Sequence, residues 1–136
     1  MITTRTATID LDPRGFVFAH INRGAAQSLD EARENLAGTI EACGGVRRPL
    51  LVDVTMCLPL EPEVRHYYTG EILVESFLAL GMLIEASPFG AMMGNVYLRI
   101  ARPGIPTRLF TQYDSAVTWL LQSFVPPLRS GKAPRT

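Results

Sequence analysis

The feature that most constrains the fold is a regular alternation of short apolar runs with longer amphipathic stretches. Apolar runs of strand length occupy residues 49–55, 78–84 and 107–110, and a stretch of helix length follows each of them. Strands that alternate with helices of about 10–15 residues are typically joined by right-handed crossovers into a mostly parallel sheet. The pattern therefore predicts an α/β domain.

A hairpin is expected before this alternation begins. Residues 4–11 alternate polar and apolar side chains, which is typical of a half-buried strand. Asp12-Pro13-Arg14-Gly15 favours a tight turn, because Pro stands at its second position and Gly at its fourth. Residues 16–21 then form the second strand of the expected hairpin.

Capping signals mark the first two helices. Ser28 and Glu31 have the spacing of a capping box, and Gly44-Gly45 is a typical helix end. A second helix is expected over residues 62–77, with Pro62 in its first turn. Periodicity alone could equally extend this helix through residues 78–84, where a strand is expected.

Two further helices follow in the second half of the chain. Ser87-Pro88 predicts a capped helix start, and the helix runs over residues 88–101. Thr111 and Asp114 predict a second capping box before an amphipathic last helix. The complete order is β-β-α-β-α-β-α-β-α, an α/β fold with a mostly parallel sheet of four or five strands.

Length and charge set limits on organisation and partners. The 136 residues suit one domain, predicted over residues 1–125, and residues 126–136 read as a flexible basic tail. The chain carries 13 basic and 13 acidic residues, so its formal net charge is zero. A domain that follows nucleic-acid phosphates normally has a strong positive excess, so a nucleic-acid partner is not expected.

The cysteines and the apolar segments favour a cytoplasmic location. Cys43 and Cys57 lack the CxxC spacing of redox and metal motifs, so reduced thiols are expected. The N-terminus has no apolar signal-peptide core. The most apolar stretch, residues 72–100, contains Glu75 and Glu85 and leaves no uncharged window of roughly 18 residues, so no membrane span is expected.

No motif for catalysis, a metal or a cofactor is present in the sequence. Phosphate-binding glycine loops and the nucleophile-elbow pattern are missing. His20 and His66 have no ligand set at metal spacing, although Glu63 precedes His66 by three residues. Asp53 and Asn95 lie in apolar segments, where structural hydrogen bonding is the simpler interpretation than catalysis. A non-enzymatic protein without cofactor or metal is expected.

A candidate contact surface comes from the second half of the chain. Arg99, Arg102 and Arg108 are expected near one end of the third helix and the last strand, where they could hold an anion. The free amides after Ser87 offer another anion site. Met92 and Met93 belong to a helix that is apolar nearly all round.

The chain resembles STAS-like bacterial proteins, whose domain is shared by sulfate transporters and anti-sigma-factor antagonists. The resemblance is carried by the element order and by the following segments: Ser87-Pro-Phe-Gly, Gly94-Asn-Val-Tyr-Leu, Pro106-Thr-Arg-Leu-Phe110, Ala116 and Trp119-Leu120. It implies a sheet whose strands are added in sequence order. It also implies binding of a protein partner, switched by phosphorylation in signalling members.

The phosphorylation switch of this family has no counterpart here. Val52-Asp53-Val54-Thr55 is similar to the family's strand motif, but Glu61-Pro62-Glu63-Val64 stands where signalling members have Asp-Ser-Ser-Gly. No hydroxyl is available at that position. Glu61 and Glu63 place negative charge near a helix start, which the helix dipole favours.

The sequence therefore predicts a STAS-like protein-interaction module without the phosphorylatable serine. A homodimer is also expected, because the third helix has more apolar surface than one sheet face needs. The alternative is a carrier of a small apolar or anionic ligand, similar in fold to the CRAL-TRIO lipid carriers. In that alternative the apolar third helix and its methionines line a pocket.

Overall fold

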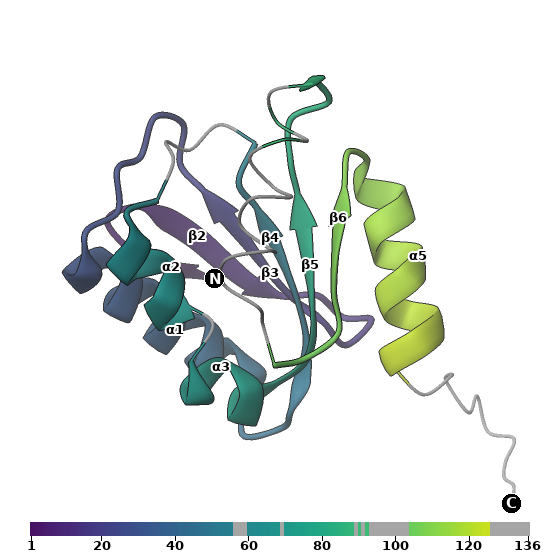
Figure 1. The fold of residues 1–136 in the computed structure, drawn as a ribbon. Coiled ribbons are helices and arrows are strands. Elements are labelled where there is room, and N and C mark those ends of the chain that lie inside the picture. The colour runs from purple at the N-terminus through teal and green to yellow at the C-terminus, as the bar shows by residue number, and fades with distance from the viewer. Residues whose placement is uncertain (56–59, 69, 89, 91, 93–103, 126–136) are drawn as a thin grey trace, which may run out of the picture.

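The structure is a computed structural model that describes residues 1–55, 60–68, 70–88, 90, 92 and 104–125. It confirms an α/β fold with a mostly parallel sheet (Figure 1). The elements in chain order are β1 Ile2–Thr3, β2 Ala7–Leu11, β3 Val17–Ile21, α1 Leu29–Cys43, β4 Arg48–Asp53, α2 Pro62–Tyr68, α3 Glu71–Ser76, β5 Phe77–Leu83, β6 Thr107–Phe110 and α5 Tyr113–Phe124. The sheet has six strands rather than the four or five expected.

The strands lie in the sheet in their sequence order, β1-β2-β3-β4-β5-β6. β1, β2 and β3 pair antiparallel, and β3, β4, β5 and β6 pair parallel. The turn predicted at Asp12–Gly15 joins β2 to β3, with the Gly15 amide donating to the Asp12 carbonyl at 2.9 Å. Gly15 has a φ of +110°, a conformation that side-chain-bearing residues rarely adopt.

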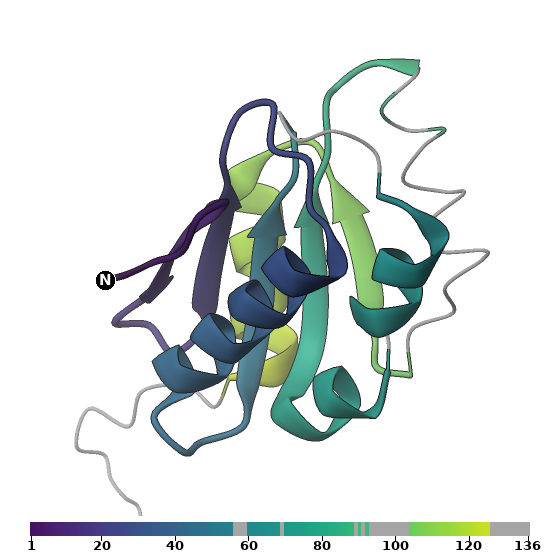
Figure 2. The ribbon, with the colours of Figure 1, turned by 90° about the vertical axis from the view of Figure 1, so that its left-hand side faces the viewer.

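Helices cover the two faces of the sheet unequally. α1, α2 and α3 lie on one face, and α5 lies on the opposite face (Figure 2). Right-handed crossovers between strands that are added always on the same side place their helices on one face. α5 follows the last strand, so this constraint does not apply to it.

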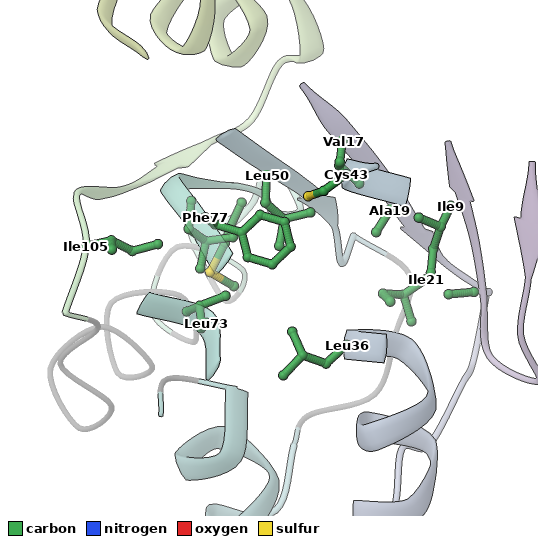
Figure 3. Close-up of a cluster of buried hydrophobic side chains, with 13 residues drawn as sticks. Ile9, Val17, Ala19, Ile21, Leu36, Cys43, Leu50, Leu73, Phe77 and Ile105 are labelled. Atoms are coloured by element: carbon green, nitrogen blue, oxygen red, sulfur yellow. The ribbon is translucent and has the colours of Figure 1, made fainter. Parts of the chain in front are cut away.

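Two apolar clusters correspond to the two faces. The larger one joins the sheet to α1 and α3 and includes Ala19, Leu36, Leu50 and Leu73 (Figure 3). The smaller one joins the sheet to α5, where Ala116, Val117 and Leu120 are buried. A sheet with both faces covered explains why β4 and β5 read as continuous apolar runs.

The first helix has both of its predicted caps. The Ser28 hydroxyl accepts from the Glu31 amide, and the Glu31 carboxylate accepts from the Ser28 amide at 2.7 Å. Gly44 ends the helix with a φ of +64°.

The helix expected over residues 62–77 is instead two short helices. α2 ends at Tyr68, and α3 begins at Glu71 after Gly70, whose backbone is extended. Glycine is a poor helix former, and the break lets both Val64 and Leu73 be buried. β5 then begins at Phe77, within one residue of the predicted start.

The predicted starts of one strand and one helix cap are also wrong. The strand predicted over residues 4–11 begins at Ala7, because the Thr4 hydroxyl accepts from the Ala7 amide at 3.0 Å and turns the chain between β1 and β2. α5 begins after Gln112 without a side-chain cap, so the capping box predicted at Thr111 and Asp114 does not form. Most of the helix predicted over residues 88–101, and the tail 126–136, lie outside the described residues.

Candidate functional site

Glu61 and Glu63 lie at the start of α2 and are exposed. The Glu61 carbonyl accepts from the amides of Val64 and Arg65, both at 3.0 Å, so Glu61 is the residue from which the helix begins. The segment therefore presents two carboxylates to solvent and no hydroxyl.

Ser87, Met92 and Arg108 are the described members of the contact surface predicted in the second half of the chain. The Ser87 hydroxyl accepts from the Gly90 amide at 3.0 Å, as a helix cap does. Met92 is 53% exposed. The Arg108 guanidinium lies over the rings of Phe110 and Trp119, at 5.4 and 5.6 Å from their centroids. Met93, Arg99 and Arg102 lie outside the described residues, so the arginine cluster stays a prediction.

A histidine–aspartate pair that the sequence analysis did not identify joins two neighbouring strands. His20 and Asp53 are register partners in β3 and β4, and His20 Nδ1 lies 3.0 Å from Asp53 Oδ2. Asp53 Oδ1 accepts from the amide of Thr55 at 3.0 Å and from its hydroxyl at 2.6 Å. Both strands were predicted, and each of these residues lies near a strand's carboxyl end. The signal that could have found the pair is therefore the parallel register of adjacent strands.

We assign the imidazole proton of His20 from this hydrogen bond. An ionised carboxylate only accepts hydrogen bonds, which places the donor proton on Nδ1. Nε2 is then the atom with a free lone pair when the ring is neutral. Within the described residues no group of three or more His, Cys, Asp or Glu side chains could hold a metal ion. Asp53 thus orients the imidazole of His20, and the described part of the chain places no third metal-ligating side chain beside the pair.

An apolar pocket of about 70 Å³ lies between the sheet and the helices α1, α2 and α3. Its walls come from three strands and three helices and are almost entirely apolar. The lining residues are Ala19, Ile21, Gln27, Asn35, Leu36, Thr39, Leu50, Val52, Val54, Leu60, Tyr68, Leu73, Leu80 and Met82. Figure 3 shows Leu36 of α1 and Leu73 of α3 pointing toward the sheet residues at this level.

Three polar side chains of the pocket wall, Gln27, Asn35 and Tyr68, form one hydrogen-bond network, and the Thr39 hydroxyl donates to the Leu36 carbonyl at 2.7 Å. The Asn35 side-chain amide donates to the Thr6 hydroxyl at 2.7 Å and to the Gln27 carbonyl oxygen at 2.9 Å. The Tyr68 hydroxyl donates to the same Gln27 oxygen, and the Thr4 hydroxyl donates to the Asn35 carbonyl oxygen. The network links the N-terminal segment to α1 and α2 and leaves the centre of the pocket apolar.

No helix in the described part of the chain is long and apolar enough to cross a membrane.

Comparison with known proteins places the chain in a family. Residues 9–124 match the family described as Domain of unknown function (DUF7793). One similar solved structure is that of a protein with unknown function from Arthrobacter sp. FB24, which is 24% identical, with 83% of this chain and 97% of that chain covered and a TM-score of 0.33. No curated protein matches the sequence. Because the matched segment spans most of the chain, this protein belongs to the DUF7793 family.

Proposed function

We propose that the protein is a non-enzymatic, STAS-like protein-interaction module of the cytoplasm that works without a phosphorylation switch. The observation that carries this proposal is the order of the sheet. A hairpin is followed by parallel strands added one after another, with the crossover helices α1, α2 and α3 on one face. The resemblance implies strands added in sequence order, so this order of the sheet supports the proposal.

The sheet order also bears on the choice between a binding module and an enzyme. In open α/β sheets, ligand crevices form where the strand order reverses and neighbouring crossovers go to opposite faces. The strands here follow sequence order from β1 to β6, so the sheet has no such reversal. The sheet order therefore supports a protein-binding surface rather than a buried active site.

The proposed contact surface is the start of α2, with Glu61 and Glu63. Both carboxylates are exposed, and Pro62 between them keeps this first turn rigid. Permanent negative charge at this position suits a partner with basic side chains. Homodimer formation through the segment around Met92 is part of the same proposal.

Affinity capture with charge-reversed variants tests this assignment. We expect the wild-type chain to recover a specific partner and the double variant Glu61→Arg, Glu63→Arg to lose it. Glu41→Arg is the matched control, because Glu41 is an exposed glutamate at the far end of α1. Phosphatase treatment of the wild-type chain is expected to leave the recovery unchanged. Equal recovery by the double variant would contradict the proposed surface, and a loss after phosphatase treatment would contradict the absence of a switch.

A further inference from the structure

We propose that the apolar pocket beneath α1, α2 and α3 is a binding site for a small, uncharged, apolar molecule. This inference is independent of the interaction role proposed above. It depends on three properties of the pocket, which are its lining, its polar wall and its size.

The lining excludes charged ligands and disfavours water. Ala19, Leu50 and Met82 face the pocket from the sheet, and Leu36 and Leu73 face it from the helices. None of the lining residues that the structure describes carries a formal charge near neutral pH. A buried water needs two to four polar partners. A water molecule gives up hydrogen bonds when it enters such a space, whereas an apolar solute has none to give up.

The Gln27 carbonyl oxygen, the Asn35 amide and the Tyr68 and Thr39 hydroxyls at the wall already have hydrogen-bond partners. The Gln27 carbonyl oxygen accepts from Asn35 and Tyr68, and the Asn35 amide donates to Thr6 as well. A ligand that carries its own hydrogen-bonding group would have to break this network to be satisfied. A ligand without such a group leaves the network intact.

Size then restricts the ligand further. An apolar cavity of about 150 Å³ holds one benzene molecule. The pocket here has about 70 Å³, so an occupant with roughly half the volume of that cavity is expected. A long acyl chain exceeds this volume, so the proposed occupant is smaller than the ligand of a lipid carrier. Xenon is a suitable probe, because it is small, uncharged and polarisable.

Methionine methyl groups report the binding directly. Met82 lines the pocket and is 8% exposed, whereas Met1 and Met92 are 86% and 53% exposed. In methyl NMR spectra under increasing xenon pressure, we expect the Met82 signal to shift and reach saturation. Met1 and Met92 are expected to shift in proportion to pressure without saturation. A Met82 shift that stays proportional, with the slope of the two exposed methionines, would overturn the proposal.

Two variants test the location and the size limit. Ala19→Ile adds three carbon atoms on the pocket floor and is expected to abolish the saturable shift. Ala37→Ile adds the same atoms at an exposed position of α1 and is expected to retain it. Leu36→Ala widens the pocket and is expected to make Met82 respond to benzene, whereas the Met82 signal of the wild-type chain is expected not to respond. This gain cannot result from unfolding, so it keeps the test valid if Ala19→Ile folds poorly. Saturable binding that persists in a folded Ala19→Ile variant would place the site elsewhere.

Discussion

His20 and Asp53 form a hydrogen-bonded pair across β3 and β4, with 3.0 Å between Nδ1 and Oδ2. The pair lies at the carboxyl ends of two parallel strands. The other carboxylate oxygen holds the amide and the hydroxyl of Thr55. One carboxylate therefore connects β3 to the chain segment that leaves β4, and the imidazole is the more exposed partner, with 45% of its side chain exposed against 17% for Asp53.

Because Asp53 makes more hydrogen bonds and is less exposed than His20, we expect substitution of the two residues to lower the free energy of unfolding by different amounts. Asp53→Ala removes three hydrogen bonds, one of them from a backbone amide, and is expected to lower the free energy of unfolding by about 1–3 kcal/mol. His20→Ala removes one half-exposed contact and is expected to cost less than about 1 kcal/mol. Urea denaturation of both variants measures the difference. A cost for His20→Ala equal to that of Asp53→Ala would show that Thr55 contributes nothing.

The tautomer of His20 gives an independent readout. Nitrogen NMR of the wild-type chain is expected to show the proton on Nδ1, because the carboxylate accepts from this atom. Without the carboxylate in Asp53→Ala, we expect the population with the proton on Nε2 to increase. An unchanged tautomer ratio would contradict the hydrogen bond.

Local signals account for the parts of the fold that could be predicted. Ser28, Glu31 and Gly44 act within one helix, so their spacing alone predicts both of its ends. The β2–β3 turn is equally local. β5 is recognisable because its residues are buried on both faces and form a continuous apolar run. In each case the interacting groups are close in sequence.

The parts that could not be predicted depend on contacts between distant residues. The poor helix propensity of glycine is a local signal at Gly70, but the separate burial of Val64 and Leu73 on the two sides of the break depends on tertiary contacts. The His20–Asp53 pair depends on the register of β3 against β4. The pocket exists because side chains from three strands and three helices leave a space between them unfilled. The periodicity of apolar residues in the sequence does not predict such a space.

Acid is expected to destabilise the fold partly through the first helix cap. Hydrogen bonds from the Ser28 side chain and amide hold the pKa of Glu31 below its usual value of 4.5. A carboxyl whose pKa is lowered by folding contributes stability above its unfolded pKa and loses it as pH falls through the folded pKa. The free energy of unfolding should therefore decrease as pH falls below about 4.5. Denaturant titrations at a series of pH values measure this dependence.

Glu31→Gln removes the titrating carboxylate of the cap together with its ion pair to Arg5 at 3.4 Å. The glutamine side chain can still accept a hydrogen bond from the Ser28 amide but does not titrate. We therefore expect the free energy of unfolding to depend less on acid than in the wild-type chain. Glu41→Gln changes an exposed glutamate of the same helix outside the capping box and serves as the control. Asp12, whose pKa is lowered by its hydrogen bond with Arg14, remains as a second source of acid sensitivity in both variants. Identical acid dependence in the Glu31→Gln and Glu41→Gln variants would contradict the role of the capping box.

β5 and the cap after it predict a clear order of stability. Leu83 is 6% exposed and packs in the cluster under α5, so Leu83→Ala is expected to cost about 2–5 kcal/mol. Ser87→Ala removes the acceptor of the Gly90 amide and is expected to cost about 1 kcal/mol. Denaturant melts of the two variants compare these costs directly. A smaller cost for Leu83→Ala would mean that this end of β5 is poorly packed.

The last prediction is that the chain forms a symmetric dimer through the apolar segment that follows Ser87. Residues 88–101 have almost no polar face by sequence, and a helix that covers a sheet needs only one apolar stripe. Met92 is 53% exposed, so at least one apolar side chain of this segment is not covered within the described structure. Extended apolar surface usually marks an interface, and closed twofold dimers are the commonest solution.

Sedimentation equilibrium with matched variants tests the dimer. Met92→Glu places a charge on the proposed interface and is expected to shift the wild-type dimer toward monomer. Ile72→Glu is the control, because Ile72 is 45% exposed but lies on α3, and this variant is expected to remain dimeric. Both variants should retain the melting behaviour of a folded chain, since neither side chain is buried. A wild-type chain that sediments as a monomer would rule out the dimer, and dissociation by Ile72→Glu instead of Met92→Glu would move the interface to α3.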